Sequence, residues 1–87
     1  MVGDAPGAVK TVSSGKYYVQ VGAFSVEENA NSTIRQLRNR GYGARSLYSS
    51  SMRLWRVQVG PYPDLGRAEA ASRDFEREGV QNFVVTD

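Results

Sequence analysis

Two short segments of the chain repeat one pattern, and each places a glutamine between two valines. Val19-Gln-Val-Gly22 returns 38 residues later as Val57-Gln-Val-Gly60. A glutamine side chain donates and accepts hydrogen bonds in one plane, which suits an amide or a hydroxyl of a ligand. Arg56 can hold a carboxylate through two parallel hydrogen bonds, and Tyr18 offers a flat apolar ring with a polar tip. These residue types predict binding of a polar ligand.

The composition argues against catalysis. The chain contains no histidine and no cysteine, so it lacks the commonest general base, the commonest metal ligand and any thiol nucleophile. A Ser-His-Asp hydrolase is excluded, and zinc would find only carboxylates, which it rarely accepts without other ligands. We interpret Glu27 and Glu28 as helix N-terminal charges rather than as a glycosidase pair. We therefore expect no catalytic residue, no metal and no cofactor.

Length and hydropathy limit the organisation of the chain. Eighty-seven residues allow one domain, with 40% hydrophobic and 23% charged residues, as in ordinary globular proteins. The mean hydropathy of −0.46 and the lack of a long apolar run exclude a transmembrane helix. Residues 1–15 are rich in small and turn-forming residues and predict a flexible tail or linker. We expect the folded domain over residues 16–87 and a longer parent protein.

Charge is unevenly distributed. The stretch 31–63 contains six arginines and no acid, whereas the rest of the chain carries five bases and nine acids. Arginine suits carboxylates, phosphates and stacked rings, so the stretch could bind an acidic ligand. It could equally form a solvated basic surface.

Each repeat has the pattern strand, helix, strand. In the first, residues 17–22 alternate, so that Val19 and Val21 point one way and Tyr18, Gln20 and Gly22 the other. Ser25-Val-Glu-Glu28 predicts a capping box at the start of a helix. Apolar residues at helical spacing follow, Gly41 ends the helix, and a short strand is expected near residues 44–48. The predicted stripe is Ala30, Ile34 and Leu37.

The second repeat follows the same plan. Residues 54–59 predict a strand, the chain then breaks at Pro61 to Asp64, and Asp64 is a candidate N-cap. Gly79 ends the second helix, and residues 82–85 predict the last strand. The apolar stripe of this helix is expected to comprise Leu65, Ala68, Ser72 and Phe75.

The order βαββαβ predicts an α+β fold, a ferredoxin-like (RNP-like) sandwich with a four-stranded antiparallel sheet and two helices on one face. The valines must face the helices, because the helices carry the only apolar stripes. Tyr18, Gln20, Arg56 and Gln58 are then expected on the opposite face, although one bulge would invert part of this alternation.

The segments Tyr17–Phe24 and Trp55–Tyr62, with a helix between them and a glycine after each helix, resemble the SPOR (sporulation-related repeat) family over residues 16–86. The resemblance implies a module that targets septal peptidoglycan by binding glycan strands without stem peptides (denuded glycans). It also implies a periplasmic location at the division septum. The parent we expect is a lytic transglycosylase of the rare-lipoprotein-A type, anchored in the outer membrane.

The resemblance also nominates residues for the glycan site. The family's glutamine of the first strand is Gln20, and Ala23 stands where a small or hydroxyl residue is common, so the side-chain hydrogen bond that some members make there cannot form. The aromatic of the third strand aligns with Trp55 or, by a strict match on Arg56, with Leu54. Trp55 is separated from the core valines of its strand by an even number of positions, so strand alternation favours a Trp55 side chain on the helix side of the sheet. The candidate set is Tyr18, Gln20, Ala23, Leu54, Trp55, Arg56 and Gln58.

Two other functions use the same fold. An RNA-binding RRM also has a βαββαβ sheet with aromatic and arginine residues, but its aromatic signature is absent from the third strand. A metabolite-sensing or protein-docking module is a further alternative, because fold alone does not decide function. For the SPOR interpretation we expect a monomer that binds peptidoglycan glycan, with no nucleic-acid or membrane contact by this domain.

Overall fold

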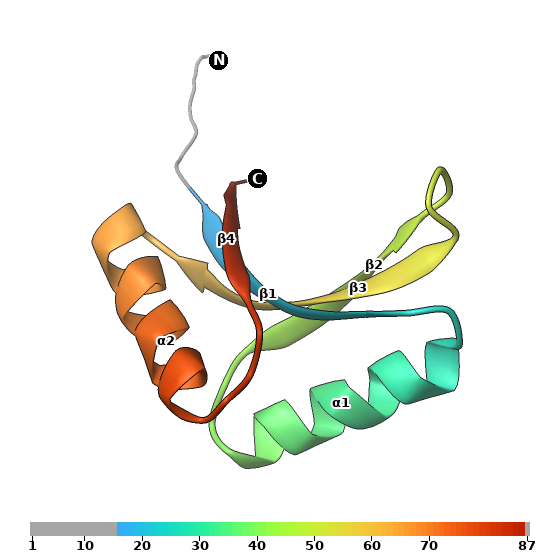
Figure 1. Cartoon of the computed structure of the whole chain (residues 1–87), viewed down its shortest axis with the longest axis horizontal. Helices are drawn as coiled ribbons and strands as arrows, with labels where there is room; N and C mark the ends of the chain where they lie inside the picture. Colours follow the sequence, from blue (N-terminus) through green and yellow to red (C-terminus); the bar gives the residue numbers. More distant parts are fainter. Residues whose placement is uncertain (1–15, 87) are drawn as a thin grey trace, which may run out of the picture.

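The structure is a computed structural model, and it describes residues 16–86. The predicted tail over residues 1–15 lies outside these residues. Both helices lie on the same side of a twisted sheet (Figure 1). Neither helix has the length and apolar character needed to span a bilayer within the described range. The elements in chain order are β1 Tyr17–Phe24, α1 Glu27–Asn39, β2 Ala44–Ser49, β3 Leu54–Tyr62, α2 Leu65–Arg77 and β4 Phe83–Thr86.

The sheet has the strand order β2-β3-β1-β4, and every neighbouring pair is antiparallel. The predicted α+β sandwich is thereby confirmed. The two central strands are the first strands of the two repeats. The glutamines of the repeats, Gln20 and Gln58, are direct partners in the β1–β3 register.

The core lies between the sheet and the helices. Val19, Val57 and Val59 of the central strands are at most 1% exposed. The predicted stripe of α1 is buried as expected. In α2 the buried residues are Ala68, Ala71 and Phe75, so the expectation for Leu65 is wrong. Leu65 is the first residue of the helix and is 46% exposed, since the stripe that meets the sheet begins one turn later.

Both helices end in the same motif. Gly41 and Gly79 have φ angles of 92° and 80°, the left-handed conformation predicted from the sequence. Beyond them, the amide groups of Tyr42 and Val80 donate to carbonyls near the helix ends, at 3.0 and 2.9 Å. These bonds satisfy carbonyl groups that the last turn leaves without partners. The tight ends turn the chain back towards the sheet.

The helix beginnings differ from each other. At α2, Asp64 Oδ1 accepts a hydrogen bond from the Arg67 amide at 2.8 Å, which confirms the predicted cap. At α1, the predicted capping box is wrong, because Val26 occupies the N-cap and makes no side-chain bond. The chain is still extended at Val26, so the helix begins too late for Ser25 to cap it. Glu27 and Glu28 stabilise the first turn through the helix dipole instead.

A β-bulge in β1 changes the alternation of its side chains. Gln20 pairs with Gln58 but Gly22 pairs with Val57, so one extra residue is inserted in β1. Gly22 therefore shares the helix side with Val57, and its predicted place on the opposite face is wrong. The same shift brings Ala23 opposite Arg56 on the face away from the helices.

A second irregularity lies where β3 passes Pro61. The predicted break at Pro61 is wrong, because β3 continues to Tyr62, which pairs with Tyr17. Pro61 lies in the register shift between the Tyr17–Tyr62 and Val19–Val59 pairs, where β3 has one residue more than β1. A β-bulge is one of the places where a strand tolerates proline.

Candidate functional site

The face of the sheet away from the helices is called the open face below. Cross-strand partners share a face, so the register of the four strands defines its members. None of the four strands contains an acidic residue, whereas two arginines lie on this face. The open face therefore offers cationic and hydrogen-bonding groups. It comprises Tyr18, Gln20, Ala23, Arg45, Leu47, Ser49, Leu54, Arg56, Gln58, Phe83 and Val85.

A chain of hydrogen bonds crosses three strands at the centre of the open face. Arg45 Nε and Nη2 donate to Gln58 Oε1 at 3.1 and 3.0 Å. Gln58 Nε2 then donates to Gln20 Oε1 at 3.2 Å. The three residues are cross-strand partners, so the sheet itself sets their spacing. We call this arrangement the amide relay.

The relay is largely buried. Gln58 is 2% exposed and Gln20 is 7% exposed. Buried amides need hydrogen-bond partners, which the relay supplies. Gln58 is therefore an internal member of the relay, whereas Gln20 also lines a pocket that a ligand can enter.

Tyr18 lies beneath Arg45 rather than in solvent. The Arg45 guanidinium carbon is 3.6 Å from the centre of the Tyr18 ring. On the backbone side the ring approaches Gly60, where an added Cβ would lie 2.9 Å from Tyr18 Cδ2. Tyr18 is 6% exposed. Its ring holds Arg45 in place by a cation–π contact and does not present a free stacking surface.

Arg56 has an unusual environment. Its Nε atom is buried and has no hydrogen-bond partner within residues 16–86. Its cross-strand neighbours are Ala23 and Leu47, and neither can accept a hydrogen bond from its side chain. A buried donor without an acceptor costs free energy unless a ligand or water pairs with it. Within the described residues, Arg56 is thus the residue of this face whose side chain has a buried donor with no partner.

The structure shows which of the two candidates, Leu54 or Trp55, lies on the open face. Trp55 packs against the helix-side core, and its ring lies 4.8 Å from the ring of Tyr48. Leu54 is two residues before Arg56 in β3, so both side chains lie on the open face, and Leu54 is opposite Ser49. The structure thus separates Trp55 from the other candidates and groups Leu54 with them.

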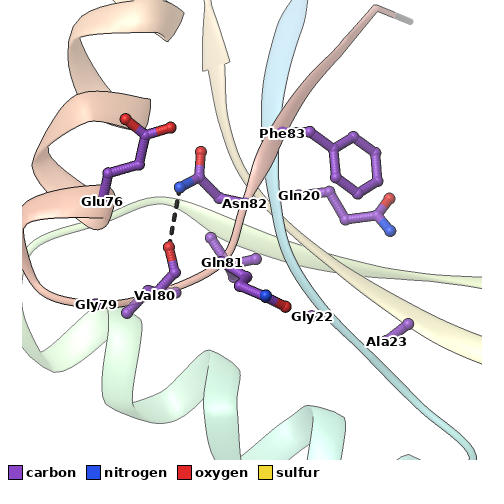
Figure 2. Close-up of a pocket in the computed structure, with 10 residues that line it drawn as sticks. Gln20, Gly22, Ala23, Glu76, Gly79, Val80, Gln81, Asn82 and Phe83 are labelled. Carbon is purple, nitrogen blue, oxygen red and sulfur yellow. Dashed lines mark hydrogen bonds between the residues drawn. The ribbon is translucent and has the colours of Figure 1, made fainter.

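A pocket of about 660 Å³ adjoins the open face at the edge of β1. β4 pairs only with Tyr17–Gln20, so the next residues of β1 have no strand on that side. Figure 2 shows Gln20 and Phe83, cross-strand partners that both line this pocket, side by side. Two further lining residues are hydrogen-bonded to each other: Asn82 donates to the Val80 carbonyl at 3.0 Å (Figure 2).

Besides the nominated residues, the open face holds Arg45, Leu47, Ser49, Phe83 and Val85, and of these Phe83 and Arg45 bear on the candidate site. Phe83 is 55% exposed and is the direct partner of Gln20 in the β1–β4 register. Arg45 heads the amide relay. Strand parity within residues 44–48 and 82–85 could have indicated both positions. Within residues 16–86 no group of three or more His, Cys, Asp or Glu residues is placed to hold a metal ion.

Comparison with known proteins identifies the family. The model of the SPOR domain family matches residues 13–86. This chain belongs to the SPOR domain family. The SPOR chain is 30% identical over 82 residues to the endolytic peptidoglycan transglycosylase RlpA of Escherichia coli, and 29% identical over 80 residues to RlpA of a second strain. It spans 93% and 91% of its own length in these matches, but 22% of each relative.

A solved structure has the same fold. This SPOR domain superposes on the peptidoglycan binding domain of the Bacillus subtilis cell wall lytic enzyme CwlC with a TM-score of 0.73. The two are 30% identical, and the match covers 92% of this chain and 99% of the other.

Proposed function

We propose that this domain is a non-catalytic cell-wall targeting module that binds peptidoglycan glycan strands lacking stem peptides through the open face. Membership of the SPOR family and the likeness to the binding domain of CwlC support a cell-wall ligand. The observation that carries the finer proposal is the buried Arg56 Nε without an acceptor, on a face whose strands contain no acid.

The chemistry of a bare glycan fits these groups. Without a stem peptide, each muramic unit exposes a lactyl carboxylate, and every sugar carries an acetamido group and hydroxyls. Arg56 can pair with the carboxylate in bidentate geometry. Gln20, the cross-strand partner of the residue two positions along β3 from Arg56, can bond an acetamido or hydroxyl group. Leu54, Ala23 and Phe83 supply apolar area beside these polar contacts.

A stem peptide changes this balance. Its amide bond to the lactyl group removes the negative charge that would meet Arg56, and its length adds bulk above the sheet. The domain therefore favours strands from which amidases have removed the peptides. Ligand-sized contacts yield about −0.3 kcal/mol per heavy atom, so a few sugars should bind at roughly micromolar Kd.

The same proposal covers location and parent. Bare strands arise where wall is being remodelled for division, so the module would concentrate its parent at the septum. The matches to RlpA favour a parent of the lytic transglycosylase type, and such a parent would supply the catalytic residues and the membrane anchor.

The test is a binding assay with purified sacculi before and after amidase digestion. The proposal expects binding to rise at least about tenfold after digestion, since a charge-assisted hydrogen bond is worth roughly 1.5–3 kcal/mol. Equal binding to both preparations would contradict the preference for bare strands, and absence of binding to either would contradict a cell-wall ligand.

The matched variants are Arg56→Met and Arg35→Met. Arg35 pairs with Glu28 on the exposed side of α1, away from the open face, and its loss changes the net charge equally. Arg56→Met should weaken glycan binding about tenfold or more, and Arg35→Met should leave it unchanged. Equal losses would indicate only a general charge effect.

The alternative function, RNA binding, is tested with the same domain and variants. The aromatic platform of an RRM requires exposed rings on the open face. Within the described residues Tyr18 is covered and Trp55 faces the helices, which leaves Phe83 as the exposed ring there. Tight binding of single-stranded RNA with a steep salt dependence would replace the glycan proposal.

A further inference from the structure

We infer that Arg45 is a positioning residue that fixes the polarity of the amide relay, so that Gln20 presents an N–H donor to the ligand and the site selects N-acetylated over de-N-acetylated glycan. The inference rests on the proposed glycan-binding function and adds a specificity to it. Its basis is the direction in which hydrogen bonds run from Arg45 to Gln58 and on to Gln20.

The direction follows from the chemistry of the first member. A guanidinium carries donors and no acceptor. The group of Gln58 that faces Arg45 must therefore be its oxygen, and it accepts two bonds there, from Nε at 3.1 Å and Nη2 at 3.0 Å. Turning the Gln58 amide over would place its NH₂ group against the guanidinium and lose both bonds.

The second step fixes Gln20. With the Gln58 oxygen held by Arg45, its Nε2 faces Gln20 and needs an acceptor, and Gln20 Oε1 lies 3.2 Å away. The remaining polar group of Gln20 is its Nε2, and Gln20 lines the pocket beside β4. The outward end of the relay is thus a donor.

Arg45 itself is held from below. Its guanidinium lies 3.6 Å from the Tyr18 ring centre, and Tyr18 is seated over Gly60. Burial of Tyr18, Gln20 and Gln58 leaves the relay little freedom to rearrange. The polarity is therefore a property of the folded sheet and exists before any ligand arrives.

The polarity predicts which ligand group fits. The Gln20 amide and the Arg56 guanidinium both present donors, so the face favours acceptors such as an acetamido carbonyl or a carboxylate. Removing the acetyl group turns that acceptor into an ammonium donor and adds a positive charge among arginines. Both changes oppose binding.

The experiment uses naked glycan from amidase-digested sacculi, either untreated or chemically de-N-acetylated. The unmodified domain should bind the acetylated glycan at least about tenfold more tightly. Arg45→Met and Gln58→Leu should each reduce this ratio to about threefold or less, because Gln20 can then turn either end outward. Gln58→Leu interrupts the relay without removing the positive charge of Arg45, so it separates the relay from a charge effect. Arg45→Lys keeps the positive charge and a hydrogen-bond donor at position 45, so it should retain most of the selectivity.

A spectroscopic measurement tests the relay without ligand. In ¹H–¹⁵N spectra, Arg45→Met should shift the side-chain amide signals of Gln58 and Gln20 while the backbone signals of the sheet stay in place. The control Arg35→Met should shift neither side-chain signal.

Each result has a separate meaning. Equal binding of the two glycans by the unmodified domain would overturn the selectivity while leaving the proposed function intact, and binding of neither would overturn both. Unchanged Gln20 and Gln58 amide signals in Arg45→Met, or full selectivity in Gln58→Leu, would overturn the positioning role of Arg45.

Discussion

Gln58 Nε2 donates to Gln20 Oε1 at 3.2 Å, and the two residues are separated by 38 positions, the length of the sequence repeat. The ion pair between Arg40 and Glu78 also spans 38 positions, with Nη2 2.5 Å from Oε2, and it joins the C-terminal ends of the two helices. Equivalent positions of the two repeats therefore meet each other. The repeats form one pseudo-symmetric domain, and its approximate axis passes between β1 and β3.

The amide pair should show coupling in a double-mutant cycle. Gln20→Leu leaves the buried Gln58 amide without its acceptor, and Gln58→Leu removes the donor to Gln20 and the acceptor for Arg45. Each single change should lower the free energy of unfolding by about 1–3 kcal/mol, and the double change should cost less than the sum by about 1 kcal/mol. Urea denaturation measures all four proteins, and strict additivity would contradict the coupling.

Leu54 and Trp55 should separate binding from stability. Trp55 packs on the helix side against the core and Tyr48, so Trp55→Ala should lower the free energy of unfolding by about 2 kcal/mol, somewhat less than for a fully buried ring. Leu54 lies on the open face, so Leu54→Ala should weaken glycan binding and lower the free energy of unfolding by less than Trp55→Ala does. Sacculus binding and urea denaturation of both variants, with Trp55→Phe as the conservative control, give the comparison. A binding loss in Trp55→Phe with full stability would assign the ligand contact to the tryptophan.

Gly60 should tolerate no side chain. Its φ angle of 144° is one that side-chain-bearing residues rarely adopt, and a Cβ would lie 2.9 Å from Tyr18 Cδ2 and 3.0 Å from the Tyr17 carbonyl oxygen. Gly60→Ala should therefore destabilise the domain by about 2 kcal/mol or more. The matched change Gly66→Ala lies in α2, where a Cβ meets only Asp64 Oδ1 at 3.4 Å. It should stabilise by about 0.5–1 kcal/mol, since alanine is the better helix former. Thermal unfolding that ranked the two in the reverse order would contradict this account.

Stability should fall as the pH rises through the alkaline range. Burial raises the pKa of Tyr62 above its ordinary value of 10.0, because the buried ring disfavours the phenolate. The unfolded chain then loses this proton first, so the stabilisation is complete below about pH 10 and is lost as the pH rises through the folded-state pKa. Tyr62→Phe should reduce the alkaline loss. Because the chain has no histidine or cysteine, stability should be flat between about pH 6 and pH 9, and chemical denaturation across this range checks both statements.

Much of the fold could be predicted from local pattern. The repeat, the alternating valines and the glycines after each helix depend on spacing along the chain, and spacing is visible in the sequence. The structure confirms the order of elements and the antiparallel sheet. The cap at Asp64 was predictable because its bond to the Arg67 amide is local. The first residue of α1 could not be predicted in this way, because the chain stays extended through Val26 after the end of β1.

The sequence by itself determined the kind of surface: a strand face with amides and arginines, no acids, and a core of valines behind it. Only the tertiary structure decided which side chains share that face and how they pair. The bulge that brings Ala23 opposite Arg56 depends on the register of β1 with β3, which no local pattern shows. The placement of Arg45 over Tyr18 depends on three strands lying side by side in a particular order, because contacts between distant segments form only when the sheet assembles.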